Sequence, residues 1–361
     1  MREVGCGAAG AMQGMCWDQY EPSMEDELEQ RLCKSMRSAA VTTRAPGTWS
    51  NSYTSLLARF RRFCGERLPP RKVCPAEPMT VCLFLQLVAD SARTYSVVKS
   101  ASGMIFTLHA LALVPEDKIP TKCAMAKLIR AAAKRKLGLK LVNQKDPLPL
   151  EVLRAGVVYM IGDETRVSIL ALSQAAMVMV MWCGFLRYKD MRNIYVQCIK
   201  FYKTHMEIFL HYRKNDQFRK GDIVYIARGS FSDTCPVRLA QLLISRGGLR
   251  GEEPLFQGWD GVRARWRGQG GLPLSGQPVS YDQCRQAFFK LVAKATARPE
   301  SELKAQFGTQ SCRSGGATVA AKTVDFRRFQ QHGAWQSATS AHRYIQDSVA
   351  DRVEVTQTLG Y

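Results

Sequence analysis

Two arginines and a tyrosine in the second half of the sequence have side chains suited to phosphate chemistry. Arg187 directly follows a very apolar segment, in GFLRYKD, and Arg313 lies near the start of TQSCRSGGATVAA. A guanidinium held rigidly at a helix end presents a planar fork of donors that fits a phosphate. The hydroxyl of Tyr344 is a poor nucleophile near neutral pH and needs cations beside it to attack phosphorus. Each residue alone also fits a structural role, as a helix-end charge, the polar start of a packing helix and a surface tyrosine.

Polar partners lie three positions from each arginine. Asp190 follows Arg187 at a distance that allows a salt bridge to orient the guanidinium. Gln310 precedes Arg313 by three residues, so the two would share a face of a helix whose first N–H groups favour an anion. The pair Gly315 and Gly316, which follows, permits the close approach of another backbone.

A lysine between two strand-like segments is a further candidate. Lys214 lies in HYRKNDQFRKG, a polar turn that ends in Gly221. Such a lysine is either solvated or, on a hairpin that reaches into a groove, able to deliver a proton from its ammonium group.

The elements that must position these residues are mostly helices. Apolar periodicity and breaker residues predict helices over residues 25–36, 48–68, 76–92, 94–114, 120–140, 148–160, 167–186, 280–297 and 309–321. The segment 167–186 is long enough to span a bilayer, but Ser168, Ser173 and Gln174 interrupt it. We therefore predict a buried core helix.

One β segment separates these helices. Alternating patterns over 193–199, 205–212 and 222–227 predict a three-stranded meander. Residues 247–278, rich in Gly and basic side chains, are predicted to form a long surface loop. The fold class expected is mainly α with a small three-stranded antiparallel sheet.

The sequence divides into four parts by composition. We predict a poorly ordered tail over 1–45, a helical domain over 46–141, a linker over 142–150 that contains two prolines, and an α+β domain over 151–361. The helical domain carries basic side chains in two places, Arg59, Arg61 and Arg62, and Lys134, Arg135 and Lys136.

Charge and cysteine usage narrow the class of protein. The chain of 361 residues has a formal net charge of +20, which favours a polyanionic partner, most commonly nucleic acid. The 12 cysteines are dispersed and form no C-x-x-C pair, so we predict no metal site and a reducing compartment. We find no apolar signal-peptide region at the N-terminus and expect an intracellular protein with no membrane association.

The order of the motifs resembles the tyrosine recombinase (phage integrase) family. Gly184–Asp190 matches the box of the first arginine, a hairpin lysine is best matched by Lys214, and Gln310 with Arg313 and the following GGAT matches the second box. Trp335 precedes Tyr344 by nine positions, as the family's His or Trp precedes its tyrosine. The resemblance covers residues 145–361, and the preceding helical domain resembles the family's core-binding domain.

The resemblance implies a site-specific DNA recombinase that joins DNA through a 3′-phosphotyrosine. Tyr344 would be the nucleophile, Arg187 and Arg313 would hold the phosphate, Lys214 would protonate the leaving oxygen, and Trp335 would contact the phosphate. It implies that two domains close as a C-shaped clamp on duplex DNA. It also implies a dimer or tetramer on DNA, with a tail after Tyr344 that packs on a neighbouring subunit. The biological role implied is in a mobile element. No cofactor and no small-molecule substrate are implied. The compartment would be the cytoplasm in a bacterium or phage host and the nucleus in a eukaryote.

One residue departs from the family pattern. Gln310 stands where the family usually has His, and glutamine donates a hydrogen bond but cannot shuttle a proton. Gln310 favours a first alternative, an inactive or weakened DNA-binding protein of the same fold. Two others stay open: a type IB topoisomerase-like enzyme that nicks and reseals DNA with a similar tyrosine and arginines, and a basic helical RNA-binding protein.

Overall fold

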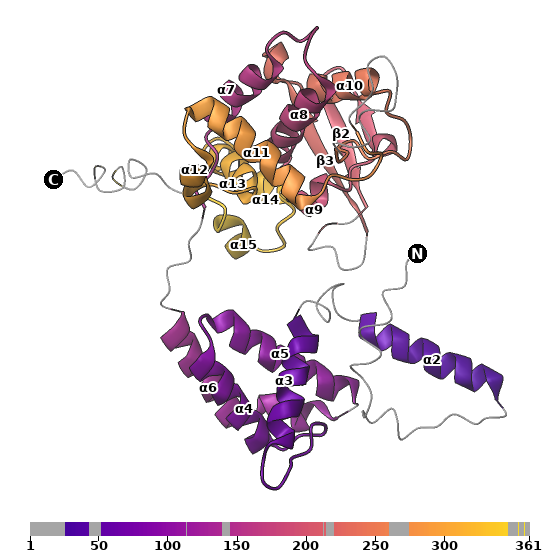
Figure 1. The fold of residues 1–361 in the computed structure, drawn as a ribbon, viewed down its shortest axis with the longest axis vertical. Helices are drawn as coiled ribbons and strands as arrows, with labels where there is room; N and C mark the ends of the chain where they lie inside the picture. The colour runs from indigo at the N-terminus through magenta and orange to yellow at the C-terminus, as the bar shows by residue number, and fades with distance from the viewer. Residues whose placement is uncertain are drawn as a thin grey trace. The chain divides into compact units, whose positions relative to one another are not determined.

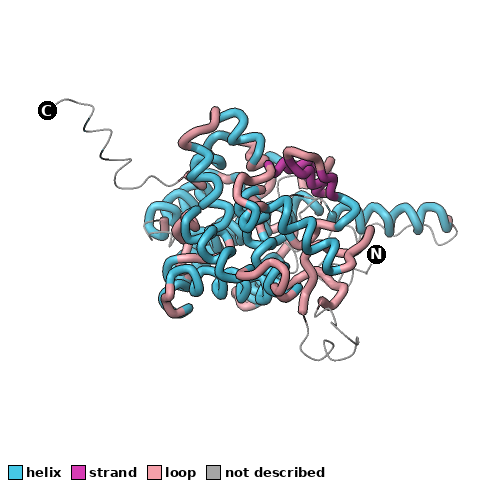
Figure 2. Tube along the Cα trace, turned by 90° about the horizontal axis from the view of Figure 1, so that it is seen from above, coloured by secondary structure: helices cyan, strands magenta, loops and turns pink. Residues whose placement is uncertain are grey.

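The computed structural model describes residues 26–42, 52–112, 114–138, 145–211, 213, 220–259 and 274–345, with 353 and 357. Helices dominate this part of the chain, and the strands gather in one small sheet (Figure 2). The chain forms two compact units, Met1–Asn143 and Gln144–Tyr361, named here the N-terminal unit and the C-terminal unit. The predicted fold class, mainly α with a small three-stranded antiparallel sheet, is confirmed.

Five helices make up the described part of the N-terminal unit (Figure 1). They are α2 (Glu27–Thr42), α3 (Thr54–Gly65), α4 (Pro78–Ser91), α5 (Tyr95–Leu111) and α6 (Ala124–Leu137), with short 3-10 turns at Glu116–Lys118 and Pro120–Lys122. The core of α3 to α6 is apolar, and the Phe60 and Phe84 rings lie 4.8 Å apart inside it. Helix α2 runs past the predicted end at residue 36; residues 1–25 and 43–45 of the predicted tail lie outside the described residues.

The C-terminal unit is built around one helix that is buried on all sides. Its helices are α7 (Leu150–Ile161), α8 (Ile169–Cys183), α9 (Tyr188–Met191), α10 (Pro236–Gly247), α11 (Tyr281–Thr296), α12 (Glu300–Gln306), α13 (Gln310–Ala321), α14 (Phe326–His332) and α15 (Ala338–His342). Every residue of α8 from Leu172 to Trp182 is buried, against α7, α10, α11 and α13. This confirms the prediction of a core helix, because a helix apolar all round needs neighbours all round. Among the helices that the structure describes, none is long and apolar enough to cross a membrane.

The sheet has the predicted meander order. Strands β1 (Ile199–Phe201), β2 (His205–Leu210) and β3 (Asp222–Ala227) are antiparallel, with Ile208 of β2 paired to Ile199 and Val224. The alternation predicted for β2 is confirmed for Met206, Ile208 and Leu210, which are all buried.

The first predicted strand, over residues 193–199, is largely wrong. Only its last residue belongs to β1, and Val196–Cys198 form a 3-10 turn instead. The backbone N–H groups of Val196 and Gln197 donate to the carbonyls of Glu253 and Gly251. A distant loop therefore satisfies this backbone, and the β-branched pattern of the segment does not reveal that partner.

That loop also corrects the prediction of a surface loop over residues 247–278. Leu255 and Phe256 are fully buried, and the N–H of Leu255 donates to the Ile194 carbonyl at 2.8 Å. The part of the loop that the structure describes thus contributes to the core of the unit; residues 260–273 lie outside it.

Two local predictions in the C-terminal unit are confirmed. Ser280 and Gln283 form the capping box of α11, each side chain bonding to the other's backbone N–H. Gly315 and Gly316 place α13 against α8: a Cβ atom on either would lie closer than 3.0 Å to atoms of Leu148, Trp182 or Phe185. Only glycine fits here, so this pair fixes how near α13 comes to the end of α8.

Replacing Gly315 with alanine should destabilise the C-terminal unit by about 1–3 kcal/mol, because the added methyl group overpacks a backbone contact. The free energy of unfolding, from urea denaturation, measures this. Gly229→Ala is the matched control, since its Cβ would meet nothing nearer than 3.5 Å. Equal stability of the two variants would contradict the role given to Gly315.

Candidate active site

Arg187 is positioned by the turn that ends α8. Gly184 and Phe185 follow the helix, and Phe185 adopts a positive φ of 48° before the buried Leu186. The turn then starts the short helix α9 at Arg187. The carboxylate of Asp190 accepts the backbone N–H of Arg187 at 3.0 Å, whereas its oxygen is 4.0 Å from Nη1 of the guanidinium. Asp190 therefore orients Arg187 mainly by capping α9, and less through the predicted salt bridge.

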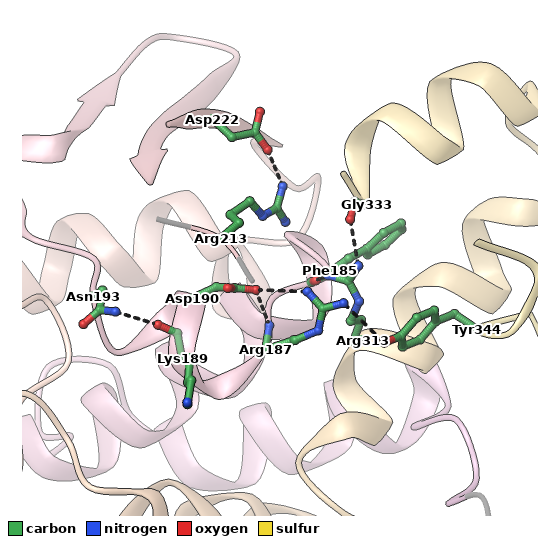
Figure 3. Close-up of polar contacts among 10 residues, drawn as sticks. All are labelled: Phe185, Arg187, Lys189, Asp190, Asn193, Arg213, Asp222, Arg313, Gly333 and Tyr344. Atoms are coloured by element: carbon green, nitrogen blue, oxygen red, sulfur yellow. Dashed lines mark hydrogen bonds and ion pairs between the residues drawn. The ribbon is translucent and has the colours of Figure 1, made fainter. Parts of the chain in front are cut away.

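Arg313 projects from α13 into the interior of the unit, where its side chain is 0% exposed. The guanidinium donates to the carbonyl oxygen of Phe185 and, at 2.7 Å, to that of Gly333 (Figure 3). It forms no ion pair with any described carboxylate, and its Nε–H is buried without a hydrogen-bond partner. Burial, and next the like charge of Arg187, lowers the pKa of Arg313. An anion bound here would relieve the cost of that buried charge.

Tyr344 lies two residues after the end of α15 and contacts both arginines. Its backbone carbonyl accepts the Thr318 hydroxyl of α13 at 3.2 Å, and its hydroxyl accepts Nη2 of Arg187 at 3.5 Å. The guanidinium carbon of Arg313 is 4.9 Å from the centre of its ring. Burial raises the pKa of the phenol, but the charges of Arg187 and Arg313 outweigh it and leave the pKa below its usual value. The two guanidiniums thus favour the phenolate, the form that attacks phosphorus.

Trp335 also lies against the Arg313 guanidinium, next to the ring of Tyr344. The ring lies 4.7 Å from the guanidinium carbon and 5.3 Å from the ring of Tyr344. It packs in a small cluster with Phe185 and Phe329. Its indole N–H is buried without a hydrogen-bond partner, so this donor is available to an oxyanion if the site opens.

Two predicted residues are not part of this cluster as the structure describes it. Gln310 lies one turn before Arg313 on α13, but its side chain is exposed while Arg313 is fully buried. Lys214 lies outside the described residues, so the prediction for it stays a prediction.

Two residues near the site were not among the predicted ones. Arg213, the neighbour of Lys214 in sequence, is 3% exposed and forms an ion pair with Asp222 at the start of β3. His332 lies edge-on to Phe185 and bonds through Nε2 to the Cys183 carbonyl at 2.9 Å. Burial is the first cause of the lowered pKa of His332, which keeps the imidazole neutral. The polar turn and the segment HGAW were the only sequence signals for them.

The basic residues predicted for DNA binding lie on two helices of the N-terminal unit. On α3, Arg59 and Arg62 are exposed, Arg61 is half-buried, and Nη2 of Arg59 donates to the Ser91 hydroxyl at 2.8 Å. On α6, the three basic residues Lys134, Arg135 and Lys136 occupy the last turn and are all exposed. Part of that positive charge stabilises α6 itself, because cations near the C-terminus of a helix interact favourably with its dipole.

Residues from four separate stretches of chain therefore converge on one point, and Figure 3 draws three of them, Arg187, Arg313 and Tyr344. Arg187 comes from the α8–α9 turn, Arg313 from α13, Trp335 from the loop after α14, and Tyr344 from the end of α15. The arrangement places a phenol of lowered pKa beside two guanidiniums, with unpaired buried donors near it. Chemically, such a site can bind an oxyanion and stabilise negative charge that develops beside the phenol oxygen.

Comparison with solved structures shows the fold of the tyrosine recombinases. The Tn1549 transposon integrase in complex with transposon right end DNA matches with a TM-score of 0.51 and 12% identity, over 85% of this chain and 93% of that one. The XerH site-specific recombinase, in a post-cleavage complex with palindromic difH substrate, matches with a TM-score of 0.52 and 12% identity, over 92% of this chain and 84% of that one. No protein-family model and no curated protein matches the chain.

Proposed function

We propose that this chain is a site-specific DNA recombinase that cuts and rejoins duplex DNA through a 3′-phosphotyrosine on Tyr344. The observation that carries the proposal is the fully buried Arg313, which has no carboxylate partner among the described residues and lies against the ring of Tyr344. A buried cation without a counter-ion is costly unless an anion joins it. The tyrosine recombinase fold and the net charge of +20 make a DNA phosphodiester the anion that fits best.

The cleavage step follows from the positions of the side chains. The phenol oxygen of Tyr344 forms a bond to phosphorus, and the bond from phosphorus to the 5′ oxygen breaks. Arg187 and Arg313 stabilise the charge that develops on the non-bridging oxygens. The phenol proton passes to solvent, which the lowered pKa of Tyr344 favours. Lys214 donates a proton to the departing 5′ oxygen.

Rejoining runs the same step in reverse, with a 5′-hydroxyl as the attacking group. One phosphodiester is exchanged for another of similar energy, so the protein needs no nucleotide to drive the reaction. Exchange of strands between two duplexes requires several active sites, so the protein acts as a dimer or tetramer on DNA. The exposed basic residues of α3 and α6, among them Arg62 and Lys134, bind the phosphate backbone.

A trapping experiment tests the proposal. A duplex that the protein binds is first selected from a random-sequence pool. It is then nicked so that the fragment bearing the 5′-hydroxyl dissociates after cleavage. A protein–DNA adduct that resists denaturation supports the recombinase, and exchanged or junction products distinguish it from an enzyme that only relaxes supercoils. If no adduct forms on a duplex that the protein binds tightly, the result would favour a DNA-binding protein of the same fold that does not cleave DNA.

Gln310→His should keep or raise the rate of adduct formation. The Gln310 side chain is exposed at the first turn of α13, so imidazole fits without repacking. An imidazole can donate a hydrogen bond as glutamine does, and it can also carry a proton. A positioned acid–base group typically raises a reaction rate on the order of 10²–10⁴-fold. The single-turnover rate on the nicked duplex measures this. A clear loss of rate would show instead that glutamine is required at this position.

A further inference from the structure

Arg213 is a buried arginine with two unsatisfied donors beside the site. Its side chain is 3% exposed, and its one ion pair joins Nη1 to the carboxylate of Asp222. The Nε–H and the Nη2 group are buried and have no hydrogen-bond partner among the described residues. A folded protein rarely leaves such donors unsatisfied, because each costs the free energy of its desolvation. A ligand oxygen would satisfy both.

The position of Arg213 points to the same ligand as the two other arginines. Its charge acts on both Arg313 and His332, lowering the pKa of each, which requires that it lie near them. Figure 3 shows its guanidinium between the Asp222 carboxylate and the Arg187–Arg313 pair. The free donors therefore lie on the side of the hairpin that carries the active site.

Charge balance also favours an anion. Among the residues that the structure describes here, three guanidiniums, those of Arg187, Arg213 and Arg313, face two carboxylates, those of Asp190 and Asp222, and His332 is neutral. Three positive charges less two negative charges leave one positive charge in a largely buried cluster. A phosphodiester carries one negative charge and gains a second during nucleophilic attack, so the cluster complements it before and during the reaction.

We propose that Arg213 is a third guanidinium of the phosphate-binding site, donating through Nε and Nη2 to a non-bridging oxygen of the bound phosphate. Asp222 holds Nη1 and thereby aims the other two donors, so it is a positioning residue. This inference rests on the proposed function for the identity of the phosphodiester, but the binding of an oxyanion is independent of catalysis.

Binding of inorganic phosphate tests the proposal without requiring cleavage. The dissociation constant is measured at constant ionic strength for the full chain. Arg213→Lys keeps a cation for Asp222 but loses the fork of donors, and should weaken phosphate binding on the order of 10- to 100-fold, as expected for lost charge-assisted hydrogen bonds. Arg238→Lys is the matched control. Arg238 lies on α10, and its guanidinium pairs with the Glu164 carboxylate at 2.8 and 2.5 Å. The dissociation constant for phosphate should not change in this control.

Asp222→Asn separates a phosphate contact from a purely structural clasp. The amide oxygen of asparagine can still accept the Nη1–H and so aim the other two donors. Loss of the negative charge leaves Arg213 less neutralised, so phosphate binding should stay equal or tighten. If Arg213 only closed the ends of the hairpin, Asp222→Asn and Arg213→Lys would weaken binding alike. That result, or unchanged binding in Arg213→Lys, or no phosphate binding by the wild-type protein, would overturn the proposal.

Cleavage of a neutral substrate gives a second readout. A methylphosphonate at the scissile position removes one charged oxygen, so the defect of Arg213→Lys on the phosphodiester should largely vanish on it. An undiminished defect on the methylphosphonate would count against a phosphate contact. If the wild-type protein binds phosphate through Arg213 but forms no adduct with DNA, the proposed recombinase activity fails while the assignment of Arg213 stands.

Discussion

Tyr344→Phe should abolish the covalent adduct with nicked duplex DNA and leave DNA binding unchanged. The phenol oxygen is the group that bonds to phosphorus, and nothing in the phenylalanine side chain can replace it. Trapping on the nicked duplex measures the adduct, and a gel-shift titration of the same duplex measures the dissociation constant. Tyr159→Phe is the control. Tyr159 lies on α7 and is 61% exposed, so this variant should form the adduct at the wild-type rate.

The substitution should also leave the fold intact. The phenylalanine ring keeps its contacts with Trp335 and Arg313, and the 3.5 Å hydrogen bond from Arg187 is lost. We expect a change in the free energy of unfolding of no more than about 1 kcal/mol. A persistent adduct in Tyr344→Phe would show that another side chain is the nucleophile.

Arg313→Lys should lower the rate of adduct formation by about 10²–10³-fold. Removing one preformed donor to a developing oxyanion has an effect of this size. Lysine carries the charge but cannot donate at once to the carbonyls of Phe185 and Gly333 and to a phosphate, as the planar guanidinium can. The single-turnover rate on the nicked duplex gives the measurement.

The same change should destabilise the C-terminal unit. At least one of the two buried carbonyls would lose its donor, at a cost of about 1–3 kcal/mol. Rates are therefore compared well below the unfolding temperature of the variant, with Arg238→Lys as the control for an arginine outside the site. A variant that is stable and cleaves at the wild-type rate would contradict the role given to Arg313.

The parts of the fold set by local pattern could be predicted from the sequence. The all-apolar α8, the alternation of β2 and the capping box of α11 each follow from neighbouring residues. The same holds for the glycines of α13, whose lack of a side chain predicts a close approach without naming the partner.

The rest depended on contacts between distant segments. Residues 193–199 have strand-like chemistry, but their N–H groups bond to the loop near Glu253. Leu255 and Phe256 lie in a Gly-rich, basic loop, and only the folded chain shows that they belong to the core.

The site shows the same division. The order of motifs indicated Arg187, Arg313, Trp335 and Tyr344, and the structure brings these four residues together. Sequence spacing overstated the salt bridge of Asp190, whose carboxylate mainly caps the backbone of α9. The burial of Arg213 could not be predicted, because a basic residue in a polar turn is ordinarily solvated.

Mapping the covalent bond tests the central claim most directly. The adduct trapped on a nicked duplex is digested with nuclease and trypsin, and the modified peptide is sequenced by mass spectrometry. Cleavage after Arg343 and Arg352 releases a peptide that begins with Tyr344. We expect a nucleotide attached through its 3′ phosphate to the oxygen of Tyr344. Attachment to any other residue, or through a 5′ phosphate, would contradict the mechanism.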